Sequence, residues 1–165
     1  MESIVPFWDD YHLTLNYTTE QFRDPTQLEF WVKSGHDSNK LTIDLCQFNT
    51  DNDITTRIKS YFSNLDHIGI CFHRLRPGHY LPLHKDKYGF YSKKYNISDL
   101  DLIKRYIIFL EDCSPGQMLI VKDTVYSNWK AGDIAHWQGT DIHSAVNLGM
   151  TDRYTLQVTG IINDR

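Results

Sequence analysis

The sequence predicts a mainly β protein, an antiparallel double sheet of the jelly-roll class, and three observations support this prediction. From His67 onward the apolar residues recur with a period of two, as in strands with two different faces. Separators with turn chemistry, such as Pro77-Gly78 and Ser114-Pro115-Gly116, divide this stretch, and few helical patterns interrupt it. Many short strands with few helices between them are typical of a double-sheet jelly roll. The strands are expected over residues 67–76, 80–86, 104–112, 117–122, 125–130, 133–138, 142–147 and 153–162.

The N-terminal part, about 1–66, is expected to be helical and irregular, with helices that brace one outer face of a β-core at about 67–162. A first helix is expected over 27–33, capped from the segment 18–22. Asp53 is expected to cap a second helix, whose apolar residues share one face that is suited to packing. The 165 residues are long enough for one domain with its own core, which is the expected organisation.

Composition excludes several classes of protein. The net charge of −4 gives no electrostatic footprint for nucleic acid. The three cysteines share no C-x-x-C spacing, which disfavours a disulfide scaffold or a zinc ribbon and favours a reducing compartment. No run approaches the roughly 18 apolar residues of a membrane span, and the first residues do not resemble a signal peptide. The expectation is a cytoplasmic, soluble protein without nucleic-acid or membrane partners, while its oligomeric state stays open.

A candidate metal site lies in His84-Lys85-Asp86 together with His143. Two imidazoles and one carboxylate on one face of a cation form the facial triad of non-haem Fe(II) oxygenases, whereas a closed zinc site needs a fourth ligand. Residues two apart on a strand point to the same side, so His84 and Asp86 can reach one ion if this segment is extended. An isolated H-x-D tripeptide more often consists of solvated surface residues than of metal ligands. Order, spacing and strand context together predict that these three residues bind the metal and form the catalytic centre.

Arg153 lies ten positions after His143, which is far enough for a turn and a return strand that brings its guanidinium near the metal. An unpaired buried Arg is costly, so an anion is expected beside it. Thr155, two residues later, can donate its hydroxyl to the same anion or can be an ordinary strand residue. Strand parity also predicts an inward position for Tyr80, Pro82, Arg105, Ile107, Phe109 and Gln157. Leu81 and Leu83 are expected to face the other way, under the helices.

Three stretches carry a resemblance to a known family: residues 72–78 leading to 84–86, residues 105–110 followed by Pro115-Gly116, and residues 129–133 continuing through His143 to Arg153. From Gly69 to Gly160, a little over half the chain, the sequence resembles the catalytic core of the aspartyl/asparaginyl β-hydroxylase family. That family belongs to the 2-oxoglutarate/Fe(II) oxygenases.

The resemblance implies a double-stranded β-helix that uses Fe(II), 2-oxoglutarate and O2. It implies that His84 and His143 bind the iron and that Arg153 holds the distal carboxylate of 2-oxoglutarate. Arg105 corresponds to a second basic position around the cosubstrate, and His73, in the first matching stretch, is assigned to cosubstrate binding as well.

Two positions depart from the family's pattern. Some animal members lack a carboxylate at the position of Asp86, so its presence here resembles the bacterial members and completes three ligands. Ile107 stands where those members carry a second His for the cosubstrate. The segment from Lys87 to Ile103 is also longer than the animal pattern. Its Tyr- and Lys-rich part is expected to be either a substrate lid or a solvated connecting loop.

These observations predict a 2-oxoglutarate- and Fe(II)-dependent dioxygenase that hydroxylates an aspartyl/asparaginyl side chain of an acidic peptide or protein, or a free amino acid, with release of succinate and CO2. One alternative is a cupin-like protein that binds a metal and a carboxylate without turnover. Another is a nucleic-acid demethylase on the same scaffold. The demethylase would need a basic groove and further arginines after Arg153, yet the next one is the terminal Arg165.

Overall fold

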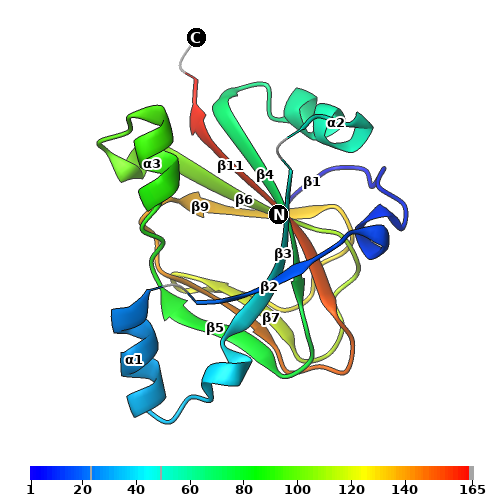
Figure 1. The fold of residues 1–165 in the computed structure, drawn as a ribbon. Coiled ribbons are helices and arrows are strands. Elements are labelled where there is room, and N and C mark those ends of the chain that lie inside the picture. Colours follow the sequence, from blue (N-terminus) through cyan, green and yellow to red (C-terminus); the bar gives the residue numbers. More distant parts are fainter. Residues whose placement is uncertain (23, 49, 164–165) are drawn as a thin grey trace.

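In the computed structural model, which describes residues 1–22, 24–48 and 50–163, the strands form two sheets that face each other (Figure 1). Every pairing is antiparallel. The larger sheet has the order β1-β9-β6-β11-β4-β3-β2 and the smaller one β5-β10-β7-β8. This arrangement confirms the predicted jelly-roll, cupin-like fold.

The larger sheet contains β1 (Glu2–Ser3), β2 (Thr18–Gln21), β3 (Thr42–Phe48), β4 (Leu65–Leu75), β6 (Ile103–Phe109), β9 (Asp133–Gln138) and β11 (Arg153–Ile162). The smaller sheet contains β5 (His79–His84), β7 (Gln117–Val121), β8 (Thr124–Tyr126) and β10 (His143–Asn147). The helices are α1 (Pro25–Lys33), α2 (Asp53–Tyr61) and α3 (Gly89–Tyr95), with short 3-10 turns at Tyr11–Thr14, Ser38–Lys40 and Leu100–Leu102. No helix in the described ranges is long and apolar enough to cross a bilayer.

The two faces of the larger sheet have different roles, and β11 shows this most clearly. Leu156 and Val158 are fully buried on its outer face, where Leu156 lies opposite Phe72 of β4 and Ile108 of β6. Alternate residues of the same strand, beginning with Arg153, line a cavity between the sheets. Because strand side chains alternate, one strand supplies both the core and the candidate site.

The outer face of the larger sheet is covered by α2 and by the N-terminal segment. Ile58 within α2 and Phe62 just after its end join Trp8 in the apolar cluster on this face. The predicted bracing role is therefore confirmed for the second helix. Its N-cap is Asn52, whose side chain accepts a hydrogen bond from the Thr55 amide, whereas Asp53 is the first helical residue.

The first helix differs from its prediction in two ways. Residues Thr18–Gln21 form strand β2 and do not cap it; Asp24 does, by accepting hydrogen bonds from the amides of Thr26 and Gln27. The helix also lies away from α2, near β5 at one end of the barrel (Figure 1). Its Trp31 is buried with its ring edge toward His84, at a centroid distance of 6.3 Å. The bracing prediction is thus wrong for α1, which helps to build the candidate site.

Several predicted strands have different bounds. The strand expected at 125–130 ends at Tyr126, and Trp129 lies beyond it, stacked on Phe109 at 4.0 Å between ring centroids. The strand expected at 80–86 ends at His84. Strand β3 was not predicted, because its Asp44 occupies the outer face among apolar residues and interrupts the apolar pattern. Asp44 is buried there, where Arg74 and Arg76 neutralise its charge.

Candidate metal centre and carboxylate pocket

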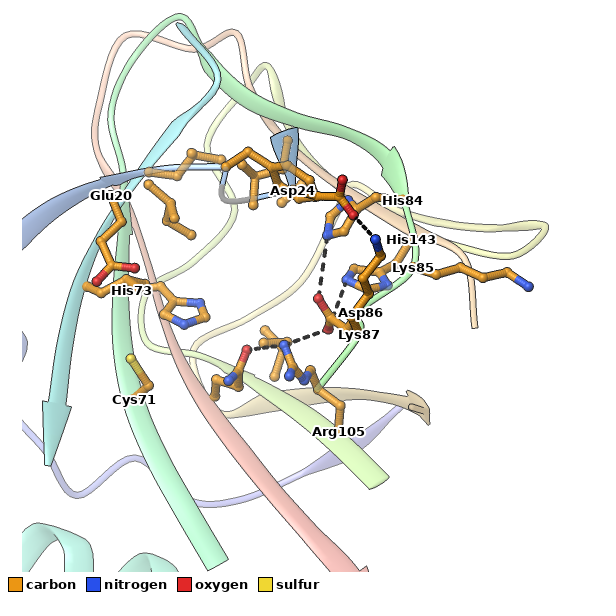
Figure 2. A pocket seen from close by; sticks show the side chains of 18 of the residues that line it. Glu20, Asp24, Cys71, His73, His84, Lys85, Asp86, Lys87, Arg105 and His143 are labelled. Atoms are coloured by element: carbon orange, nitrogen blue, oxygen red, sulfur yellow. Dashed lines mark hydrogen bonds and ion pairs between the residues drawn. The ribbon is translucent and has the colours of Figure 1, made fainter. Parts of the chain in front are cut away.

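The three predicted metal ligands come together at one end of the smaller sheet (Figure 2). His84 ends β5 and His143 begins β10, and the two are paired across these strands. Asp86 lies two residues beyond the strand end, with Oδ1 3.8 Å from His84 Nε2 and Oδ2 3.6 Å from His143 Nε2. The ligand atoms of the three residues all lie within 4.8 Å of one another. A two-His-one-carboxylate group of this size can hold one metal ion.

Both imidazoles are oriented by backbone carbonyls. His84 Nδ1 lies 2.7 Å from the Pro82 oxygen, and His143 Nδ1 lies 3.0 Å from the Asp141 oxygen. Because a carbonyl only accepts hydrogen bonds, each Nδ1 must carry the proton, which leaves the Nε2 lone pairs directed at the centre. Burial lowers the pKa of His84 and lowers that of His143 to about 4. Both rings are therefore neutral at pH 7, as metal binding requires.

Aromatic side chains pack around these rings. Phe22 contacts His84 edge-on at 4.9 Å between centroids, and Trp137 lies 4.8 Å from His143. Neither aromatic residue was predicted to belong to the site. Phe22 precedes α1 and Trp137 lies in β9, so only the tertiary fold brings them to the histidines.

The predicted faces of β5 are wrong for the residues that precede His84. Leu81, not Pro82, lines the cavity, and the Tyr80 hydroxyl lies outside it, 2.9 Å from His36 Nδ1. The cause is a register shift, because His143 pairs with His84 but Ala145 pairs with Leu81. Three residues along β5 therefore pair with two along β10. Such a bulge turns the side chains on its far side to the opposite face of the sheet. Leu83 is 53% exposed and is not covered by helices.

A cavity of about 770 Å³ lies between the sheets and includes the three candidate ligands. The predicted inward faces of β6 and β11 are confirmed, because these strands line the cavity with Arg105, Ile107, Arg153, Thr155 and Gln157. Strand β4 contributes His73. A cavity of this size falls in the range of small-molecule sites, about 300–1,000 Å³.

Arg153 is a buried cation that has no counterion among the described residues. Its Nη1 donates a hydrogen bond to the Met118 carbonyl at 3.0 Å, while its Nε has no partner. The guanidinium lies against the rings of Trp129 and Phe109, 5.2 and 5.8 Å from their centroids, and none of the described carboxylates pairs with it. Burial lowers its pKa to about 10, so it remains charged at pH 7. These features fit a carboxylate ligand, which would neutralise the cation and use the free donor.

His73 and Thr155 lie opposite each other on β4 and β11. Burial and the charges of Arg105 and Arg153 lower the pKa of His73 to about 3, so its ring is neutral and able to accept or donate one hydrogen bond. The fold thus brings His73, Thr155 and Arg153 into one cavity with the metal ligands, as predicted, while their cosubstrate roles stay predictions.

Arg105 differs from Arg153 because it has an acidic partner, although its Nε, like that of Arg153, has no hydrogen-bond partner among the described residues. Its Nη1 forms an ion pair with Asp86 Oδ2 at 2.9 Å and donates a hydrogen bond to Gln157 Oε1 at 2.6 Å. The Tyr88 ring lies 4.9 Å from the guanidinium carbon. Burial alone would raise the pKa of Asp86, but the charge of Arg105 and the two histidines outweigh it and lower that pKa. Tyr88 was not predicted as a site residue, although it follows Asp86 by only two positions.

The Tyr- and Lys-rich segment is structured. It contains α3, and the residues flanking this helix, Tyr88 and Asn96, both have left-handed backbone conformations with φ of 49° and 53°. Lys87 forms an ion pair with Asp24, and both residues line the cavity (Figure 2). The segment is therefore anchored beside the cavity and contains a helix, so it is not a simple solvated loop. A role in substrate recognition stays a prediction.

No protein-family model and no curated protein sequence matches the chain. Solved structures with a similar fold include a predicted oxalate decarboxylase from Thermotoga maritima, with 16% identity, 73% of this chain and 82% of that chain covered, and a TM-score of 0.46. A cupin 2 conserved barrel domain protein from Rhodopseudomonas palustris has 9% identity, 91% and 75% coverage, and a TM-score of 0.48. KdgF from Halomonas sp. has 10% identity, 74% and 81% coverage, and a TM-score of 0.45. At these identities the likeness concerns the cupin-like fold alone.

Proposed function

We propose that this protein is a 2-oxoglutarate- and Fe(II)-dependent dioxygenase that hydroxylates an aspartyl/asparaginyl side chain or a free amino acid, with release of succinate and CO2. The observation that carries the proposal is Arg153, a buried cation without a counterion in the same cavity as a two-His-one-carboxylate group. A metal site alone would fit many cupin-like proteins. The combination with a buried carboxylate anchor favours a metal-chelating diacid as the cosubstrate.

His84, Asp86 and His143 are the residues that would hold the iron. Three protein ligands leave positions open for the cosubstrate and O2, unlike a closed four-ligand site. When bound, Fe(II) supplies the reduction of O2 that is coupled to oxidative decarboxylation of 2-oxoglutarate and to hydroxylation of a substrate C–H bond. One oxygen atom ends in succinate and the other in the new hydroxyl group.

Arg153 would bind the carboxylate of 2-oxoglutarate that lies farthest from the metal. Its planar guanidinium can donate two parallel hydrogen bonds to a carboxylate, which a Lys cannot match. The neighbouring Trp129 and Phe109 exclude water from the guanidinium, and this strengthens its attraction for the carboxylate. Thr155 and His73, which lie on the same inner face, would complete the polar contacts of the cosubstrate.

The prime substrate would enter beside the cosubstrate, at the end of the cavity where Arg105, Gln157 and Tyr88 lie. The cavity volume of about 770 Å³ leaves room for a second small molecule or for a side chain of a peptide. The Gln157 amide and the Tyr88 hydroxyl on these walls favour a polar substrate. A free amino acid and an acidic peptide both satisfy this chemistry.

The test is anaerobic reconstitution with Fe(II) and 2-oxoglutarate, followed by exposure to O2 in the presence of free amino acids or acidic peptides. We expect succinate release that increases with one substrate class and depends on both Fe(II) and 2-oxoglutarate. The alternative result is a protein that binds the metal and carboxylates but releases no succinate with any substrate of the screen or without substrate. That result would identify a cupin-like binding protein.

A further inference from the structure

Asp86 is the predicted metal ligand that lies outside the sheets. His84 and His143 are fixed by the pairing of β5 with β10 and by hydrogen bonds from their rings to carbonyls. Strand β5 ends at His84, so no strand pairing holds the backbone of Asp86. The orientation of its carboxylate must therefore depend on side-chain contacts.

Arg105 supplies the contact that the strand does not. Its side chain is 14% exposed, and its Nη1 lies 2.9 Å from Asp86 Oδ2. Gln157 Oε1 accepts a hydrogen bond from the same nitrogen at 2.6 Å, and the Tyr88 ring packs at 4.9 Å. The guanidinium is thus held by an amide from β11 and by an aromatic ring while it contacts the carboxylate.

We infer that Arg105 is a positioning residue for the metal centre, which binds Oδ2 of Asp86 and so presents Oδ1 beside His84 Nε2. This inference rests on the metal-binding part of the proposed function and is independent of 2-oxoglutarate. It gives Arg105 a different role from the cosubstrate contact that the family resemblance implies. Arg153, which has no acidic partner, is then the one of these two arginines available to a carboxylate ligand.

Two effects of Arg105 on metal affinity oppose each other. A cation beside the ligand atoms repels a divalent metal, so its removal would tighten metal binding. An oriented carboxylate favours the metal, so removal of the orienting group would weaken binding. Loss of an outer-shell partner of a metal ligand typically weakens metal affinity about 10–100-fold, so we expect the orienting effect to dominate.

A double-mutant cycle tests the inference directly. Co(II) affinity is measured by calorimetry and by the visible ligand-field spectrum for the wild type, Arg105→Gln, Asp86→Asn and the double variant. We expect Arg105→Gln to raise the Co(II) dissociation constant about 10–100-fold and to alter the spectrum. In the Asp86→Asn background the same change should shift the dissociation constant by no more than about twofold, because Arg105 acts through Asp86.

Arg105→Lys provides a conservative rescue, because it keeps a positive charge beside Oδ2. It should restore part of the Co(II) affinity and the wild-type spectrum. If Arg105→Gln does not fold, Arg105→Met, which likewise removes the charge and the donors, replaces it in the same cycle. Arg74→Gln is the matched control, because it removes another half-buried Arg–Asp pair, with Asp44, on the outer face of the same sheet. It should lower stability and leave Co(II) affinity unchanged.

The inference is wrong if Arg105→Gln has the same effect with and without the Asp86 carboxylate, or if it tightens Co(II) binding. It is also wrong if the variant binds Co(II) normally but loses affinity for 2-oxoglutarate at saturating metal, since Arg105 would then contact the cosubstrate. Failure of the proposed function gives a different result. If the wild-type protein binds Co(II) but no 2-oxoglutarate, the proposed oxygenase function is wrong, while the double-mutant cycle on Co(II) affinity can still be interpreted.

Discussion

Two arginines, the half-buried Arg105 and the buried Arg153, line the same cavity, and their different surroundings separate their roles. Arg105 is neutralised by Asp86 at 2.9 Å, whereas Arg153 has a backbone carbonyl and two aromatic rings as its neighbours. A buried cation that lacks a counterion reduces stability, and proteins commonly retain such a residue for ligand binding. The inward position of Arg153 could be predicted from strand parity. The pairing of Arg105 could not, because it joins two segments that only the tertiary fold brings together.

Arg153→Leu is expected to weaken 2-oxoglutarate binding to the metal-loaded protein about tenfold or more, because it removes a charge-assisted donor pair. Metal affinity should not change. The ligand-free variant should unfold at the same temperature as the wild type or a higher one, because a desolvated cation is replaced by an apolar side chain. Calorimetric titration and thermal unfolding measure these effects. Unchanged 2-oxoglutarate affinity would place the anchor elsewhere.

His73 is expected to make stability depend on acid pH. Its folded pKa of about 3 lies below the ordinary value of 6.5, so below pH 6.5 the unfolded chain binds a proton that the folded protein does not. Stability is therefore lost as pH falls from about 6.5 toward 3, by at most about 1.4 kcal/mol per pH unit for this group. Urea unfolding at pH 6.5, 5.5 and 4.5 should show that the free energy of unfolding falls less steeply with pH in His73→Gln than in the wild type. Equal slopes in both proteins would contradict the neutral, buried ring.

At the scale of elements, the regular alternation of apolar and polar residues predicted the strand faces correctly. Where pairing interrupts that alternation, the prediction failed. The faces of β6 and β11 follow from their sequences. In β5, the bulge against β10 places Leu81 in the cavity, where the sequence predicted Pro82. A bulge depends on the pairing of two strands, so one strand's sequence does not reveal it. Helix α3 was missed because it follows Tyr88, whose left-handed backbone is uncommon for a bulky residue.

Helix α1 is expected to contribute to the metal site through Trp31, which packs against Phe22 and faces His84. Trp31→Ala should lower the free energy of unfolding by about 3–5 kcal/mol, as for other buried aromatic residues. It should also weaken metal binding, because the packing around His84 is lost. Phe30→Ala is the matched control, since Phe30 is adjacent and 66% exposed, and its effect should stay within about 0.5 kcal/mol. Equal effects of the two changes in urea unfolding would argue against the contact.

At the scale of the whole molecule, the apolar core and the candidate site lie on opposite faces of the larger sheet. Its outer face holds an apolar cluster with α2, and its inner face holds the polar residues of the cavity. The change of period at His67 was enough to predict this architecture, while the H-x-D motif, the later histidine and their strand context predicted the three candidate ligands that the fold brings together. The neighbours of those ligands, including Phe22, Trp31 and Tyr88, come from segments whose positions the pattern did not predict. The class of prime substrate likewise depends on the walls that these segments build.

The most direct test of the central claim is calorimetric titration of 2-oxoglutarate into the protein with and without Mn(II), an inert substitute for Fe(II). The proposed function predicts one equivalent of binding that requires the metal, because chelation and the Arg153 contact would act together. Glutarate, which keeps both carboxylates but lacks the 2-oxo group, should bind more weakly and depend less on Mn(II). A wild-type protein that binds Mn(II) but not 2-oxoglutarate, or that binds 2-oxoglutarate equally well without metal, would contradict the proposed oxygenase site.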